Sequence, residues 1–294
     1  LIDSISVGAD AVYRHQPGAG PRLVLEGGNV LDTRTPGQVT IDDDSFVIID
    51  RGPLKATFAV QGHFVDPAGT TLCDRFAEVP AYESMGFTAV ITLTRGQSHM
   101  DLQFQFRNEC SDLFSGGAPW PGWTTVDQVS WELPLNMGDA PTRYFAGGGD
   151  VLSTNQNVVV AQGKGGGNPW RRRAQVTVGG NNMENAEGFD RPMVALGDGN
   201  IAVIAQMPWM RFREPQALAA DETGVSIRVV SERLTIGAAK GLWNFARLSF
   251  VSQVNGAAAL EVPRARNAAA LERGLLVRAD LSDVNAARVF PSLG

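Results

Sequence analysis

The sequence predicts an all-β fold, a large antiparallel β-sandwich, from two features. The first is the segment from Phe87 to Arg107, where apolar side chains recur at every second position on either side of the turn Arg95-Gly96-Gln97-Ser98. Successive strand side chains point to opposite faces, so this alternation predicts a half-buried hairpin with a fixed register. The second feature is a content of 33 Gly and 16 Pro, which divides the chain into many short segments.

In the first part of the chain, short apolar stretches separated by turn residues predict strands. They lie at 2–7, 22–25, 39–41, 46–50, 54–60, 87–94 and 99–107. Gly52-Pro53 predicts a turn, and Asp66-Pro67 with Gly69 predicts a turn-rich loop before the central hairpin.

The second part continues the pattern after a Gly/Pro/Trp loop at 111–123. Further strands are predicted at 126–135, 158–161, 171–178, 194–196, 201–206, 225–230 and 242–251. Gly197-Asp198-Gly199-Asn200 predicts a hairpin turn, and 179–182 predicts another turn. Only the end looks helical, over about 264–273, where alanines are frequent and Gly274 is placed as a C′ cap.

The domain organisation predicted is one sandwich domain over residues 1–294. Length alone suggests about two domains, but β-sandwiches reach roughly 250 residues as one, and no internal repeat or linker is visible. The chain begins at Leu1 without Met, so we expect a processed product or a piece of a longer protein. Its lysine-poor, Asn/Gly/Thr-rich β character predicts an extracellular or periplasmic location.

Charge and cysteine content narrow the function classes. A net charge of −6 argues against nucleic acid as a partner, because phosphate binding needs a basic surface. No apolar run approaches the roughly 20 residues that a membrane-spanning helix needs.

Cys73 and Cys110 flank the central hairpin and are either joined by a disulfide or present as two thiols. Asp42-Asp43-Asp44 is either a calcium site or a set of solvated turn carboxylates, and no other cofactor is predicted.

Candidate catalytic residues are histidines and tyrosines near the predicted strand ends and in loops. His63 ends one strand and His99 opens the polar row of another, and an imidazole suits general acid–base chemistry near neutral pH. A surface histidine without a catalytic role is the alternative for both. Tyr82 and Tyr144 lie beside Glu or Arg residues, where a tyrosine can transfer a proton during sugar elimination.

Candidate binding residues are aromatic or basic. Trp120 and Trp123 lie in the Gly/Pro/Trp loop and either stack on sugars or fill one end of the sandwich. Arg171 and Arg173 share one face of a predicted strand. They either clamp a uronate carboxylate or protect a solvated strand edge.

A set of short segments follows the order of a known family. They include 49–56 continuing to Gly62, 186–189, Met207-Pro208-Trp209, 214–218 and Gly237-Ala238-Ala239-Lys240. Together they resemble the exo-rhamnogalacturonan lyase and YetA-like proteins over roughly residues 45–290. The resemblance implies a galactose mutarotase-like β-sandwich of the supersandwich type.

The resemblance also implies β-elimination at a uronic acid next to rhamnose. His63, Tyr82, His99 or Tyr144 would then supply the base and the acid, Arg107 would neutralise the uronate, and Lys240 would bind substrate. The family's Thr-His-Glu after Ala-Lys is replaced here by Gly241-Leu242-Trp243, and its Pro-Lys turn by Pro215-Gln216. Members that lose such groups keep the scaffold for binding or for assembly, so the resemblance does not decide whether this protein is catalytic.

Two functions are therefore predicted. The first is a polysaccharide lyase-like protein that cleaves or binds acidic glycans. The alternative is an extracellular structural or surface-assembly protein that self-associates through the same sandwich. A lyase should bring titratable groups and an arginine together, whereas an assembly module should expose apolar patches or strand edges.

Overall fold

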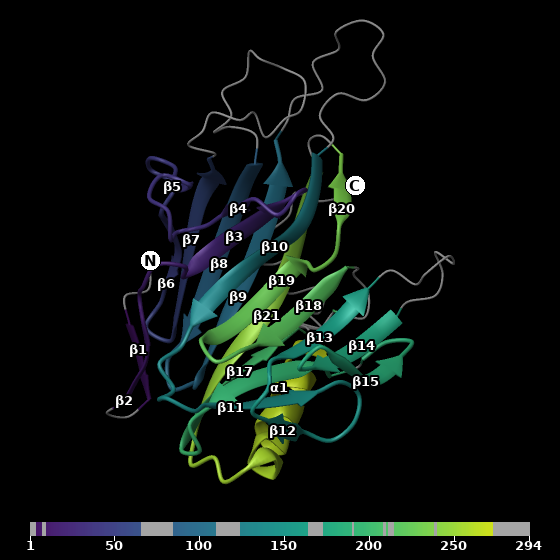
Figure 1. The fold of residues 1–294 in the computed structure, drawn as a ribbon. Coiled ribbons are helices and arrows are strands. Elements are labelled where there is room, and N and C mark those ends of the chain that lie inside the picture. The colour runs from purple at the N-terminus through teal and green to yellow at the C-terminus, as the bar shows by residue number, and fades with distance from the viewer. Residues whose placement is uncertain are drawn as a thin grey trace, which may run out of the picture.

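The computed structural model has two large antiparallel sheets packed face to face, the arrangement of a β-sandwich (Figure 1). The structure describes residues 4–7, 10–65, 85–109, 124–163, 173–189, 191–207, 210, 215–237 and 240–272. The all-β sandwich with a short C-terminal helix is thereby confirmed.

One sheet has nine strands and lies in front in Figure 1. In spatial order its strands are β15 (Asn181–Ala186), β14 (Arg173–Val178), β13 (Val158–Gly163), β18 (Gln216–Ala220), β19 (Gly224–Val230), β10 (Thr124–Pro134), β3 (Gly20–Leu25) and β4 (Val30–Leu31), and β20 (Leu234–Ile236) pairs with β10.

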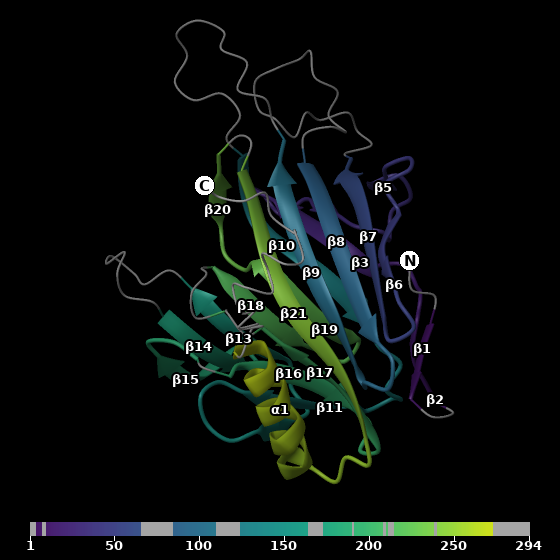
Figure 2. The same ribbon diagram turned by 180° about the vertical axis from the view of Figure 1, so that it is seen from behind.

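The other sheet has ten strands and lies in front in Figure 2. Its order is β12 (Leu152–Thr154), β11 (Thr142–Ala146), β16 (Met193–Gly197), β17 (Ile201–Gln206), β21 (Lys240–Ser252), β9 (His99–Asn108), β8 (Met85–Thr94), β7 (Lys55–Phe64) and β5 (Val39–Ile41), and β6 (Val47–Arg51) pairs with β7. A separate two-stranded sheet joins β1 (Ser4–Val7) to β2 (Asp10–Arg14).

The main core lies between the two large sheets. The alternation along β9 buries Met100, Leu102, Phe104 and Phe106 and leaves the polar residues between them on the opposite face. Phe104 meets Trp131 of the facing sheet with ring centroids 5.5 Å apart in an edge-to-face arrangement. The inner row of β9 is therefore part of the contact between the sheets.

A second, smaller core lies on the outer face of the ten-stranded sheet. There η3 (Ala257–Leu260) and α1 (Glu261–Glu272) cover β11, β16 and β17, as Figure 2 shows. Buried side chains between them include Tyr144, Ile204 and Leu260. In the described part of the chain, no helix is long and apolar enough to cross a membrane. Helix α1, which also contacts β21, thus covers one half of this outer face, and β7, β8 and β9 lie in the open half, as Figure 2 shows.

Several element boundaries differ from the sequence prediction. The helix begins at Glu261 instead of 264, because Pro263 fits the first turn, where its missing N–H has no intrahelical partner to lose. The strand predicted to end at Val60 continues to Phe64, which places His63 within β7. Strands β2, β4, β11, β12, β15, β18 and β20 were not predicted.

Candidate functional site

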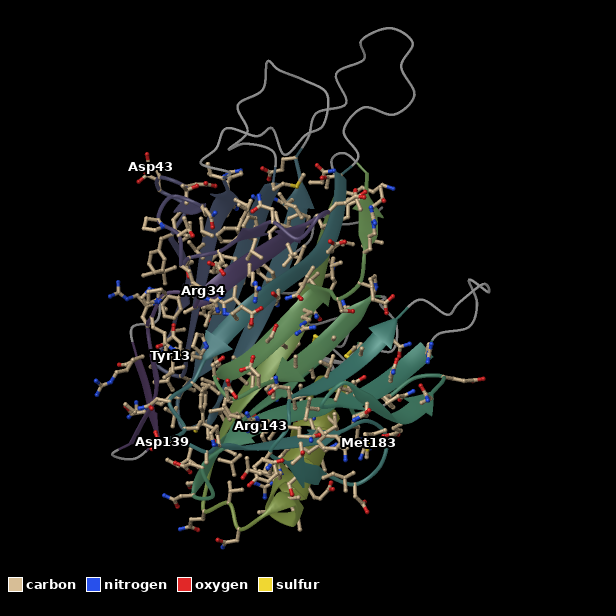
Figure 3. The ribbon with its side chains drawn as sticks, in the orientation of Figure 1. Tyr13, Arg34, Asp43, Asp139, Arg143 and Met183 are labelled. Atoms are coloured by element: carbon tan, nitrogen blue, oxygen red, sulfur yellow. The ribbon has the colours of Figure 1, made fainter. Side chains whose placement is uncertain are left out.

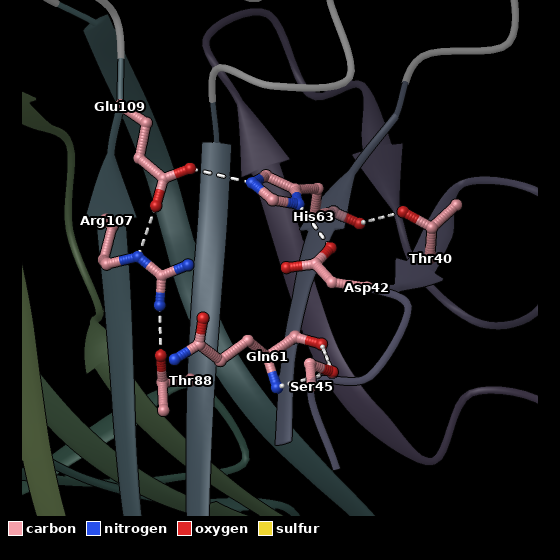
Figure 4. A network of polar contacts seen from close by, with 8 residues as sticks. All are labelled: Thr40, Asp42, Ser45, Gln61, His63, Thr88, Arg107 and Glu109. Carbon is pink, nitrogen blue, oxygen red and sulfur yellow. Dashed lines mark hydrogen bonds and ion pairs between the residues drawn. The ribbon is translucent and has the colours of Figure 1, made fainter. Parts of the chain in front are cut away.

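The candidate site is a polar cluster on the open half of the ten-stranded sheet, shown in Figure 4. Cross-strand register aligns His63 of β7 with Gly86 of β8, and Gly86 with Arg107 of β9. Aligned residues of a sheet share one face. These positions lie opposite the core-facing row of β9, so the cluster is on the outer surface.

Gly86 leaves room at the centre of this row. A Cβ at that position would lie 2.7 Å from Nη2 of Arg107 and 2.7 Å from Oε1 of Glu109. Any larger residue would have to displace both side chains. The glycine therefore allows groups from β7 and from the end of β9 to meet over the backbone of β8.

His63 is held between two carboxylates. Its Nδ1 is 2.7 Å from Oδ1 of Asp42, and its Nε2 is 2.8 Å from Oε2 of Glu109. A neutral imidazole carries one N–H and an imidazolium carries two, so only the imidazolium donates to both carboxylates. The ring is thereby fixed in orientation at both nitrogens.

Arg107 completes the cluster from the other side of Glu109. Its Nε donates to Oε1 of Glu109 and its Nη1 donates to the hydroxyl of Thr88 (Figure 4). No described residue accepts a hydrogen bond from Nη2 of Arg107, the nitrogen nearest to the position of a Cβ on Gly86.

Asp42 is positioned by the turn that follows β5. Its backbone N–H donates to the carbonyl of Gln61 at 3.1 Å, and the Ser45 hydroxyl donates to the same carbonyl at 2.9 Å. Both contacts tie the turn to β7 directly beside His63. The turn thus places the Asp42 carboxylate beside His63, which is 21 residues away in sequence.

The next positions along this face belong to β21. Gly241 aligns with Arg107 and Trp243 aligns with Gln105. Trp243 is 40% exposed, so part of its indole face is open to solvent beside the cluster. An exposed aromatic ring next to hydrogen-bonding side chains is a combination suited to binding an amphipathic ligand such as a sugar.

The structure brings together two of the predicted catalytic residues, His63 and Arg107, through Glu109. It does not bring His99 or Tyr144 to them. His99 begins β9, whereas Arg107 lies near the other end of that strand. Tyr144 is 3% exposed and packs in the core under α1. Tyr82 lies outside the described residues.

The environment of His99 differs from that of the cluster. Burial lowers the pKa of His99, the charge of Arg247 lowers it further, and the charge of Asp101 opposes the shift. Arg247 and Asp101 form a two-point ion pair, with Nε–Oδ1 and Nη2–Oδ2 distances of 2.7 and 2.9 Å. This end of the sheet face is therefore built around an internal ion pair.

The predicted binding residues are dispersed. Arg173 is exposed at the start of β14 in the other sheet. Lys240 is exposed at the start of β21 but aligns with the buried Asn108, so it does not share the sheet face of the cluster. Trp120, Trp123 and Arg171 lie outside the described residues, as do Cys73 and Cys110.

Sequence reasoning missed Glu109, and it gave Asp42 no part in this site. Glu109 continues the polar alternation of β9 by one further step, which is the signal that could have identified it. Asp42 was considered only for calcium. Among the described residues, no group of three or more His, Cys, Asp or Glu side chains is arranged to hold a metal ion.

Comparisons with known proteins assign no family. No protein-family model matches the sequence, and no curated protein matches it. Solved structures do resemble it at low identity. An α-N-acetylgalactosaminidase from Bifidobacterium bifidum has a TM-score of 0.45 at 15% identity, over 92% of this chain and 36% of that chain. The GH36 α-galactosidase AgaA from Geobacillus stearothermophilus has a TM-score of 0.43 at 8% identity, over 80% of this chain and 30% of that chain.

A putative aldose 1-epimerase from Klebsiella pneumoniae has a TM-score of 0.40 at 9% identity, over 85% of this chain and 64% of that chain. The chain thus spans about a third of the length of the two glycosidases and less than two thirds of the epimerase. Because every one of these TM-scores is below 0.5, the chain is not assigned to any of these groups.

Proposed function

We propose that the outer face of the ten-stranded sheet binds a uronate-containing glycan and cleaves it by β-elimination at the His63–Glu109–Arg107 cluster. The observation that carries this proposal is the convergence of an imidazole, a carboxylate and a guanidinium over Gly86. Elimination needs a cation for the uronate carboxylate, a base for the C5 proton and an acid for the leaving oxygen.

Each group has one role in this reaction. Arg107 binds the uronate carboxylate through Nη2 and so favours loss of the neighbouring proton. The Glu109 carboxylate accepts the C5 proton, the C4–O bond breaks, and a C4=C5 double bond forms. The His63 imidazolium gives a proton to the leaving oxygen, while Asp42 holds the ring in place.

The contact between Glu109 and His63 returns both groups to their starting protonation states. After one turnover Glu109 is protonated and His63 is neutral. The 2.8 Å contact between Oε2 of Glu109 and Nε2 of His63 provides a direct path for that proton to return to the imidazole. No other reactant is consumed, since elimination adds no water to the products.

The test is a spectrophotometric assay. We expect ultraviolet absorbance from unsaturated uronate to rise when the protein is incubated with polygalacturonate or rhamnogalacturonan. Glu109→Gln and His63→Gln should each lower the rate by about 10²–10⁴-fold, the usual contribution of one acid–base group. Arg107→Met should also lower it, by removing the carboxylate-binding cation.

Gln103→Ala is the matched control, because Gln103 is exposed on the same strand and the same face but away from the cluster. It should leave the rate unchanged. A flat trace with every polysaccharide would reject elimination. Glycan binding that is lost in Arg107→Met but kept in Gln103→Ala would then show that the face binds without catalysis.

A second candidate function, assembly, is favoured by an exposed apolar surface around β6. Phe46, Val47, Ile48, Ile49 and Leu54 are between 43% and 68% exposed. β6 pairs only with β7 among the described strands. An exposed apolar strand at a sheet edge is a template for pairing with another chain.

Sedimentation velocity tests the assembly function. If β6 mediates self-association, the protein should sediment as an oligomer, and Ile49→Lys should convert it to the monomer. A wild-type protein that sediments as a monomer at all concentrations tested would reject self-association through this strand.

A further inference from the structure

A polar pocket lies on the outer face of the nine-stranded sheet, away from the His63 cluster. Its volume is about 270 Å³, and β3, β10 and β19 contribute to its lining. In Figure 3, where this sheet faces the viewer, Arg34 lies at this surface. The volume is close to the lower end of the range for small-molecule sites.

Two arginines that line the pocket, Arg22 and Arg228, are aligned with one serine between them. Ser130 of β10 aligns with Arg22 of β3 on one side and with Arg228 of β19 on the other. Ser130 is fully buried, while the two arginines are partly exposed. Aligned residues share a sheet face, so two guanidinium groups flank one serine.

One nitrogen of each guanidinium group lacks a partner within the described part of the chain. Nε of Arg22 and Nε of Arg228 are buried without a hydrogen-bond acceptor. A buried donor without a partner costs about 1–3 kcal/mol. Burial lowers the pKa of Arg228, and the charge of Arg22 lowers it further, while Glu132 and Asp221 act in the opposite direction.

The other charged groups of the pocket have different partners. Oε1 of Glu132 accepts hydrogen bonds from the hydroxyls of Ser130 and Ser226 at 2.6 and 3.0 Å. Oδ1 of Asp221 accepts from the backbone N–H of Thr223 at 2.7 Å, within its own turn.

Arg34 is paired with Asp32, with Nη1 and Oδ2 3.2 Å apart. Arg22 and Arg228 are therefore the two cations of the pocket that form no ion pair with a described residue.

We propose that this pocket binds a small oxyanion, such as the carboxylate of a sugar acid or an inorganic sulfate or phosphate, between Arg22 and Arg228 above Ser130. Guanidinium groups match the oxygen spacing of such anions and bind them with charge-assisted hydrogen bonds. Because Arg22 and Arg228 both line the pocket, an anion in this position lies beside two cations that form no ion pair with a described residue. The proposal does not depend on the function proposed for the other sheet.

Calorimetry of the full chain tests the site, with galacturonate, sulfate and phosphate as probes and galactose as the neutral control. We expect at least one of the anions to bind and galactose not to bind. Arg22→Met and Arg228→Met should each weaken that binding tenfold or more, whereas Arg95→Met, an exposed charge-matched control in the turn between β8 and β9, should not. Binding of galacturonate alone identifies a sugar acid, and equal binding of sulfate and phosphate identifies an inorganic oxyanion.

Two further measurements test whether the anion binds at the pocket of Arg22 and Arg228. His63→Gln should leave this binding intact, so a loss in that variant would assign the anion to the His63 cluster and overturn the proposal. The melting temperature without ligand should not fall in Arg228→Met, because the change removes an unpaired buried donor. Absence of binding by all three anions, or equal affinities in wild type and both arginine variants, would also overturn the proposal.

Discussion

At the scale of single residues, the polar face depends on where side chains are absent as much as on where they are present. Gly86 is an example, since its position is flanked by His63 and Arg107 in adjacent strands. A side chain there would occupy the space in which Glu109 meets both of them. The local sequence around Gly86 gives no sign of this role, because the groups it accommodates come from other strands.

Gly86→Ala should disrupt the cluster while leaving the fold intact. The added methyl group must displace the ends of Arg107 and Glu109, which are flexible, so we expect the free energy of unfolding to change by less than about 1 kcal/mol. The imidazole NMR signals of His63 should shift, because Glu109 moves away from Nε2. Unchanged signals would show that the cluster does not require a glycine at this position.

His99 makes stability depend on pH. Its pKa in the folded protein is below the value of 6.5 that applies when it is unfolded, so the unfolded chain binds more protons as the pH falls below 6.5. Acidification through this range therefore lowers the free energy of unfolding. His99→Gln should flatten that part of the curve, as measured by urea unfolding at several pH values. Parallel curves for the variant and the wild type would contradict this assignment.

At the scale of elements, strand periodicity identified most of the ten-stranded sheet, including β8, β9, β17 and β21. Periodicity did not identify several short strands, nor a strand that is buried on both faces. β18, with the sequence QALAA, is buried at every position, so no alternation marks it as a strand. Its partners β13 and β19 supply the pairing that makes it one.

A buried arginine, Arg264, ties helix α1 to the loops that flank the ten-stranded sheet. Arg264 is 5% exposed and donates to the carbonyls of Arg191, Gly149 and Gly147 at 3.0, 2.6 and 3.3 Å. Burial lowers the pKa of Arg264, with Glu261 opposing the shift. The composition of the helix predicted its existence but not this contact.

Arg264→Met should therefore lower the free energy of unfolding by about 2–4 kcal/mol, because three carbonyls lose a charged donor. Chemical denaturation measures the loss. Arg266→Met, at an exposed position of the same helix, is the control and should change stability by less than about 0.5 kcal/mol. Equal losses in the two variants would show that Arg264 does not anchor the helix.

At the scale of the whole molecule, the two sheets share one core and expose different outer faces. One outer face carries the His63 cluster and the other carries the pocket of Arg22 and Arg228. Between the sheets, a cavity of about 290 Å³ is lined by residues that include Tyr13, Phe87 and Trp131. The apolar interior therefore separates the two proposed binding sites.

Phe104→Ala should test how strongly the sheets depend on their mutual contact. Phe104 is buried and meets Trp131 across the core, so truncation should cost about 3–5 kcal/mol of unfolding free energy. Gln103→Ala, one residue away on the opposite face, should cost less than about 0.5 kcal/mol. The contribution of this contact would be disproved by similar denaturation midpoints for the two variants.

The sequence by itself determined the fold class, most of the long strands and the polar or apolar character of each face of β9. These properties are local, because they follow from the period of two along a single strand. Only the tertiary structure decided that His63 and Glu109, 46 residues apart, meet over Gly86, and that Arg22 and Arg228 flank Ser130. Such meetings depend on which strands become neighbours and in which register, and pairing between distant segments sets both.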